Sequence, residues 1–206
     1  MIGFFNYTVI LTYLSAISAV LGITFAMHDQ GFYAILCLMF SGVCDMFDGL
    51  VARTKERSSQ EKRFGIWIDS LADIVAFGVL PAAIGYAFGL RKFYYIFILS
   101  VYILAALIRL AYYGVTEEDR QQETDGVRTS FVGLPVTSSA LIFPLLYCFK
   151  GLLTSYFPPV YALIMALTAL AFVLRVRVKK CMLGGMLVML AMGIAIFVAL
   201  VILRNH

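Results

Sequence analysis

Residues 45–73 read DMFDGLVARTKERSSQEKRFGIWIDSLAD, and this stretch decides both the fold class and where a functional site is sought. Its four aspartates are Asp45, Asp48, Asp69 and Asp73. The apolar runs that carry them, residues 31–53 and 65–88, are long enough to cross a bilayer as helices. A carboxylate at membrane depth is costly unless it has a partner, so acidic residues inside such spans indicate a functional site.

The spacing of the aspartates predicts how they meet. Asp45 and Asp48 are three residues apart and Asp69 and Asp73 are four apart, so each pair lies on one face of its helix. Two such faces turned toward each other would place four carboxylates around one point. Divalent cations with oxygen ligands, such as Mg²⁺ and Mn²⁺, are the natural partners of such a cluster.

The composition excludes a soluble domain. Hydrophobic residues make up 62% of the 206 residues and charged residues 14%, and the mean hydropathy is +0.93. Runs of about 20 apolar residues, enough to cross a bilayer, recur along the chain. We expect one all-α, polytopic integral membrane domain over residues 1–206. Its spans are predicted at 8–27, 31–53, 65–88, 93–114, 132–149, 157–174 and 182–203.

The positive charges predict the orientation in the membrane. Most of the 16 Lys and Arg residues fall on alternate connections. These are Arg53, Lys55, Arg57, Lys62, Arg63, Arg109, Arg120, Arg128, Arg175, Arg177, Lys179 and Lys180. The opposite side carries Arg91, Lys92, Lys150 and Arg204. The positive-inside rule therefore places the aspartates and the N-terminus in the cytoplasm and the C-terminus outside. The net charge of +4 reflects this topology and anionic lipid rather than nucleic-acid binding.

The residues between the two aspartate pairs suggest a ligand. Gly49 and Ala52 share the helix face of Asp45 and Asp48, so their small side chains leave a slot that a nucleotide would fill. Arg53 offers a planar donor fork for phosphate. Such a site is suited to hold a diphosphate and to stabilise the charge that grows on it during displacement.

Local signals predict several features of the fold. Ser58 and Glu61, within the basic loop 54–64, form a capping-box pattern that opens the third helix. Pro135 and Pro144 predict kinks in the fifth span, and the acidic residues 115–130 predict a surface loop. Small residues on the early spans allow close helix approach, namely Gly3, Gly22, Gly42 and Gly49.

The pattern from residue 45 to residue 73 resembles the signature of the CDP-alcohol phosphatidyltransferase family. The matching positions are Asp45, Asp48, Gly49, Ala52, Arg53, Gly65, Asp69 and Asp73. The resemblance implies a six-helix core, here with a seventh transmembrane helix, and a homodimer in the cell membrane. It also implies two divalent cations, Mg²⁺ or Mn²⁺, at a site facing the cytoplasm. Enzymes of this family move a phosphatidyl group from CDP-diacylglycerol to a hydroxyl group and release CMP.

The resemblance also implies roles for individual residues. Asp45, Asp48, Asp69 and Asp73 would bind the metals, and Asp73 would also act as the general base. Gly49, Ala52, Arg53 and Gly65 would contact CDP. Asn6 joins this set because Asn6-Tyr7-Thr8 is similar to a Pro-Asn-x-x-Thr element of relatives, although the Pro is absent. Residues 54–64 form a longer connection than the family usually has.

The flanking segments favour L-serine as the acceptor. Residues 69–82, residues 109–111 and the segment FVGLP at 131–135 are similar to phosphatidylserine synthases. Serine carries a carboxylate, so its pocket needs a cation, and Arg109 and then Arg128 are the candidates. Glycerol 3-phosphate or inositol phosphate remains an alternative acceptor. Four membrane acids would also suit an ion or proton-coupled transporter, although a relay has no need for the Gly-x-x-Ala-Arg element.

Overall fold

The structure is a computed structural model that describes residues 7–54, 58–123, 130–174, 177–179 and 183–205. The chain order of its elements is as follows. They are η1 (Tyr7–Val9), α1 (Ile10–Met27), α2 (Gly31–Val51), η2 (Ala52–Thr54), α3 (Ser59–Asp73), η3 (Ile74–Val79), α4 (Leu80–Ala87), α5 (Phe93–Glu123), β1 (Ser130–Val132), η4 (Val136–Ser138), α6 (Ser139–Cys148), α7 (Lys150–Leu153), η5 (Thr154–Tyr156), α8 (Phe157–Val173), β2 (Arg177–Lys179) and α9 (Leu183–Asn205).

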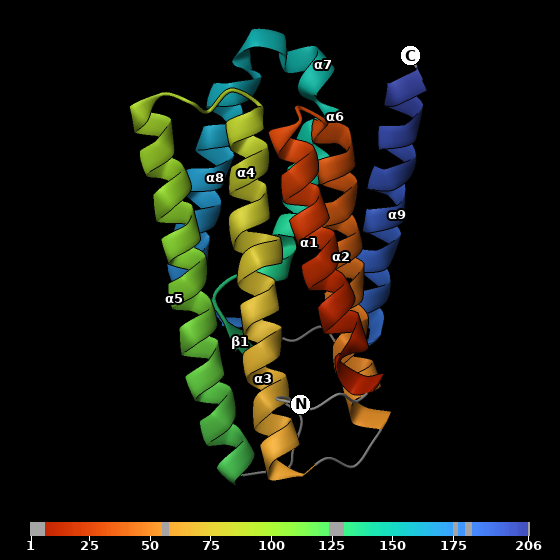
Figure 1. The fold of residues 1–206 in the computed structure, drawn as a ribbon, viewed down its shortest axis with the longest axis vertical. Coiled ribbons are helices and arrows are strands. Elements are labelled where there is room, and N and C mark those ends of the chain that lie inside the picture. The colour runs from red at the N-terminus through yellow and green to blue at the C-terminus, as the bar shows by residue number, and fades with distance from the viewer. Residues whose placement is uncertain (1–6, 55–57, 124–129, 175–176, 180–182, 206) are drawn as a thin grey trace.

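The long helices run alternately up and down the long axis of a bundle (Figure 1). Among the described residues, six helices are long and apolar enough to cross a membrane. They are Ile10–Met27, Gly31–Val51, Ser59–Ala87, Phe93–Glu117, Lys150–Val173 and Leu187–Arg204. The prediction of an all-α integral membrane bundle is therefore confirmed. The predicted last span is also confirmed as a helix of sufficient length.

The fifth predicted span is shorter than residues 132–149 suggested. Its apolar helix covers Val136–Cys148, because the residues before it cannot be helical. Val132 ends β1, which pairs antiparallel with β2, and Gly133 has a φ of +82°. Pro135 is extended, with a φ of −60° and a ψ of 139°, so it precedes the helix. The predicted kink at Pro135 is therefore wrong, whereas Pro144 lies inside α6.

Two connections on the aspartate side differ in how well they were predicted. The Ser58 side chain accepts from the Glu61 backbone N–H at 3.2 Å and the Glu61 carboxylate accepts from the Ser58 N–H at 2.9 Å. This is the predicted capping box at the start of α3. The acidic loop was expected from residue 115, but α5 continues to Glu123. Glu, Gln and Arg are good helix formers, so this polar sequence extends the helix beyond its apolar part.

Close helix approach depends on glycine at two of the predicted positions. A Cβ on Gly22 would lie 2.9 Å from the Cys37 Cβ, and a Cβ on Gly42 would lie 2.5 Å from the Ala140 Cβ. Gly22 therefore lets α1 pack against α2, and Gly42 lets α2 pack against α6. A Cβ on Gly49 would meet no described atom within 4 Å, so the expectation of helix packing at Gly49 is wrong.

Helices α3 and α4 form one continuous span that is interrupted by a π-helical segment directly after Asp73. Where the hydrogen-bond pattern changes from π-helix back to α-helix, one backbone carbonyl is left without an N–H partner. In addition, Pro81 has no backbone N–H to donate to the preceding turn. The turn before Pro81 therefore needs donors from outside the helix. The fully buried Tyr102 of α5 supplies one, since its hydroxyl donates to the Phe77 carbonyl at 2.7 Å. This contact holds the segment that follows Asp73 against α5.

Helix α9 packs on the outside of α6 and α2 (Figure 1). Its buried contacts come from Ile196 and Leu200. At its C-terminal end Arg204 donates to the Tyr33 hydroxyl at 3.0 Å and lies 4.6 Å from the centre of the Phe32 ring. These contacts attach α9 to the end of the bundle that is opposite the aspartates.

Candidate functional site

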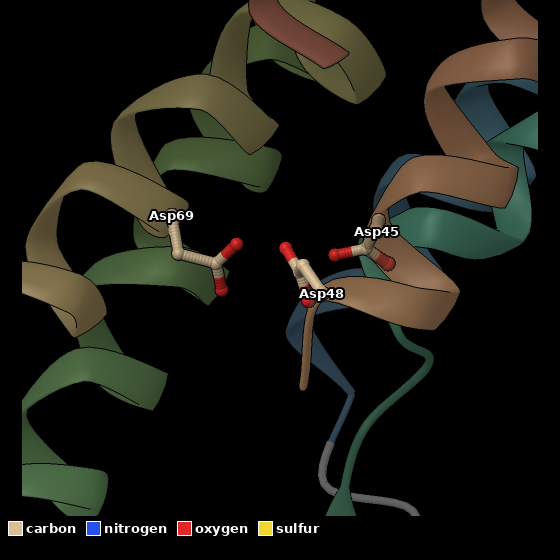
Figure 2. Close-up of side chains that lie close together, drawn as sticks. All are labelled: Asp45, Asp48 and Asp69. Atoms are coloured by element: carbon tan, nitrogen blue, oxygen red, sulfur yellow. The ribbon is translucent and has the colours of Figure 1, made fainter. Parts of the chain in front are cut away.

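The two aspartate pairs lie on neighbouring spans at the same level of the bundle. Asp45 and Asp48 belong to the last two turns of α2, and Asp69 and Asp73 to the last turns of α3. Figure 2 shows the Asp69 side chain reaching from α3 toward Asp45 and Asp48 on α2. Each pair was predicted to share one helix face, and the two faces are turned toward each other.

The carboxylates are close enough to share ligands. One oxygen from each of Asp45, Asp48 and Asp69 lies within 4.8 Å of the other two. Asp73 is the most buried of the four, with 7% of its surface exposed. Its carboxyl group lies close enough to Asp45, Asp48 and Asp69 for their negative charges to interact. The structure thus brings together all four residues that the spacing selected.

This cluster needs positive charge to be stable. Four carboxylates packed in a partly buried site repel each other, and removing them from water adds to the cost. The Asp69 Oδ1 atom is buried and has no hydrogen-bond partner among the described residues. Carboxylate oxygens are the ligands that Mg²⁺ and Mn²⁺ prefer. The residues present therefore suit divalent cations.

Two threonines outside the motif contact the aspartates of α2. The Thr137 hydroxyl of η4 donates to Asp45 Oδ2 at 2.7 Å, and the Thr12 hydroxyl of α1 donates to Asp48 Oδ2 at 3.4 Å. Neither threonine was predicted from the sequence. They lie 92 and 36 residues from their partners, and no periodicity or motif links positions so far apart.

The small residues of the motif lie beside the aspartates and leave space. Gly49 is exposed, and no described atom lies within 4 Å of the Cβ position that it leaves open. Ala52 begins η2, the turn that closes α2, and Gly65 lies one turn before Asp69 on α3. The slot expected beside Asp48 is therefore open. Arg53 lies in η2, and its side chain is outside the described part of the structure.

The N-terminal segment packs beside this turn. The Tyr7 hydroxyl of η1 and the Thr54 hydroxyl of η2 are hydrogen-bonded at 3.0 Å. Asn6, expected to contact CDP, lies outside the described residues. Its neighbour Tyr7 nevertheless places the start of the described chain next to the Ala52–Thr54 turn.

The two candidate acceptor residues differ in what the structure describes. Arg109 of α5 is buried, with 7% of its surface exposed, and its Nε donates to the Leu134 carbonyl at 3.3 Å. A Cβ on Gly133 would lie 3.6 Å from the Arg109 guanidinium carbon. Arg109 therefore supports the segment that leads to Thr137. Arg128 lies outside the described residues.

Comparison with known proteins agrees with the geometry of the site. A sequence model of the CDP-alcohol phosphatidyltransferase family matches residues 5–197. The chain is 38% identical to a CDP-diacylglycerol–serine O-phosphatidyltransferase of Saccharomyces cerevisiae over 158 residues, which is 66% of this chain and 56% of that protein. The corresponding protein of Mycobacterium tuberculosis is 33% identical over 132 residues, 64% of this chain and 45% of that protein. An archaetidylserine synthase of Methanothermobacter thermautotrophicus is 30% identical over 140 residues, 67% of this chain and 56% of that protein. The chain thus spans about half the length of the curated relatives it matches.

Proposed function

This chain belongs to the CDP-alcohol phosphatidyltransferase family, and we propose that it transfers a phosphatidyl group from CDP-diacylglycerol to L-serine. The products are phosphatidylserine and CMP. The observation that carries the proposal is the meeting of the Asp45, Asp48 and Asp69 carboxylates in a chain of this family. Serine as the acceptor is supported by the names of the relatives from yeast and mycobacteria.

Two divalent cations, Mg²⁺ or Mn²⁺, would be held by Asp45, Asp48, Asp69 and Asp73. When bound, such cations neutralise charge on the diphosphate and on the departing CMP. Two observations support this. Asp69 Oδ1 is buried and has no hydrogen-bond partner among the described residues. One carboxylate oxygen of Asp69 on α3 also lies within 4.8 Å of one oxygen each of Asp45 and Asp48 on α2. The diphosphate would therefore lie between the two helices.

Asp73 is proposed as the general base. The serine oxygen forms a bond to the phosphatidyl phosphorus while the bond from that phosphorus to the CMP oxygen breaks. The hydroxyl proton passes to the Asp73 carboxylate. Only 7% of the Asp73 surface is exposed, and this burial would limit the access of water, which competes with serine for the phosphatidyl group.

The substrate-binding residues are proposed from the motif. Gly49, Ala52, Arg53 and Gly65, together with Asn6, would bind the CDP moiety, and the open space beside Gly49 supports this placement. Arg109 and Arg128 would bind the serine carboxylate.

The proposed orientation places the aspartate end of the bundle in the cytoplasm and the protein in the cell membrane as a homodimer. The support for the orientation is that Lys62 and Arg63 lie near the start of α3, which is on the aspartate side of the bundle, whereas Arg204 lies in the last turn of α9 at the other end. The acyl chains of the substrate must stay in the bilayer while cytidine faces the cytoplasm. The site would therefore open sideways between helices.

The test is CMP release by the purified full chain in liposomes that contain CDP-diacylglycerol and Mn²⁺. We expect release that depends on L-serine and stops with EDTA. The control is Asp29→Asn, because Asp29 is exposed at the opposite end of the bundle and pairs with Arg91 at 3.5 Å. Release with glycerol 3-phosphate or inositol phosphate but not with serine would overturn the acceptor. Movement of ions across the liposomes without CMP release would favour the transporter alternative.

A further inference from the structure

We propose that Thr137 and Thr12 are positioning residues that orient Asp45 and Asp48 for cation binding. The proposal rests on the proposed metal-dependent function and adds two residues that lie outside the family signature. Thr137 comes from η4 and Thr12 from α1, so the metal site is organised by elements beyond α2 and α3.

Both threonines contact their aspartates in the same way. Each hydroxyl donates to the Oδ2 atom of its partner, Thr137 to Asp45 and Thr12 to Asp48. Hydrogen bonds from hydroxyl groups to carboxylates are short and strong when well formed, and they fix the rotamer of the acceptor. With Oδ2 held in this way, Oδ1 of each aspartate is directed to a ligand. Partners that orient ligand side chains commonly control metal affinity.

The two contacts differ in strength. The distance of 2.7 Å at Thr137 is that of a strong charge-assisted hydrogen bond, whereas 3.4 Å at Thr12 is long for a hydroxyl donor. We therefore assign the larger effect to Thr137 and a smaller one to Thr12.

The segment that carries Thr137 is held from several sides. Strand β1 pairs with β2, and the Leu134 backbone N–H donates to the Ala171 carbonyl at 3.2 Å. Arg109 Nε donates to the Leu134 carbonyl, and Ser138 donates to the Pro135 carbonyl at 2.7 Å. Thr137 therefore has little freedom to follow a moving aspartate. It instead imposes a position on Asp45.

A purely structural role predicts different behaviour. If the Thr137 hydroxyl only stabilised the fold, Thr137→Val would lower stability and leave metal affinity unchanged. If it positions Asp45, the same variant would weaken metal binding in a protein that is still folded. Thr137→Ser keeps the hydroxyl and should rescue binding. The control is Thr168→Val, because Thr168 is a buried threonine of α8 whose hydroxyl donates to the Ile164 backbone carbonyl at 2.8 Å and to no described carboxylate, whereas Thr137 is partly buried in η4.

The experiment measures Mn²⁺ binding to the purified full chain in detergent without substrate, from the electron paramagnetic resonance signal of free Mn²⁺. We expect Thr137→Val to raise the dissociation constant about 10–100-fold, the range found when partners of metal ligands are removed. Thr137→Ser and Thr168→Val should stay within about threefold of the unchanged protein, and Thr12→Val should fall between them. Thermal unfolding without metal checks that each variant is folded.

The outcomes separate this inference from the proposed function. Mn²⁺ affinity of Thr137→Val equal to that of the unchanged protein overturns the positioning role, whatever the activity. Loss of affinity in Thr137→Ser as large as in Thr137→Val also overturns it, because the hydroxyl would then not be the cause. An unchanged protein that binds Mn²⁺ but releases no CMP overturns the proposed function alone. An unchanged protein that binds no Mn²⁺ overturns both.

Discussion

Removing the Tyr102 hydroxyl should destabilise the protein through the π segment that follows Asp73. In Tyr102→Phe the Phe77 carbonyl loses the donor that lies 2.7 Å away, and the Ser139 hydroxyl loses a partner at 2.8 Å. Ser139 keeps its own contact, since it donates to the Val136 carbonyl at 2.7 Å. The buried Phe77 carbonyl is therefore the main cost.

The expected loss follows from the environment of that carbonyl. Leaving a buried acceptor without a donor costs about 1–3 kcal/mol in soluble proteins. Side-chain hydrogen bonds within membranes average about 0.6 kcal/mol because the unfolded chain also finds partners. Tyr102 is fully buried in the protein rather than exposed to lipid, so we expect a loss of about 1–2 kcal/mol in the free energy of unfolding.

The assay is unfolding by sodium dodecyl sulfate in mixed micelles, followed by circular dichroism. The matched control is Tyr112→Phe on the same helix, because Tyr112 is 46% exposed and its hydroxyl is expected to contribute little. A Tyr102→Phe variant as stable as Tyr112→Phe would refute the reasoning, since the Phe77 carbonyl would then not depend on Tyr102.

Other predictions concern the site and its helices. Asp73→Asn should lower CMP release about 10²–10⁴-fold, the usual contribution of a general base; an active variant in the liposome assay would remove Asp73 from that role. Gly42→Ala should cost about 1–3 kcal/mol by overpacking, because its Cβ would lie 2.5 Å from that of Ala140. Gly49→Ala should not lower the free energy of unfolding, because its Cβ meets no described atom within 4 Å and Ala favours a helix, but it should raise the KM for CDP-diacylglycerol; a large stability loss would contradict the open slot. Arg109→Lys should raise the KM for serine about tenfold, since Lys lacks the planar fork, and an unchanged KM would exclude Arg109 from the acceptor pocket.

Much of the fold was predictable because a membrane-spanning helix can be recognised from the length and hydropathy of a stretch of sequence. A bilayer requires about 20 apolar residues per helix, and six of the predicted spans are helices of that length and character. The capping box at Ser58 was predictable because both of its partners lie within one turn. The start of the fifth span was predicted too early, because residues 132–135 are apolar like the helix that follows them. Strand pairing at Val132 and the extended Pro135 instead keep this segment out of the helix.

The membrane class and the grouping of the four aspartates can be predicted from the sequence alone, because they depend on contacts within one helix or on the bilayer. The motif also determined the family. Which other residues complete the site depends on the packing of the helices. Three hydrogen bonds join residues that are far apart in the chain. They link Thr12 to Asp48, Thr137 to Asp45, and Tyr102 to the Phe77 carbonyl of the π segment. Such pairings arise from how helices pack against one another, and no local pattern of residues encodes them.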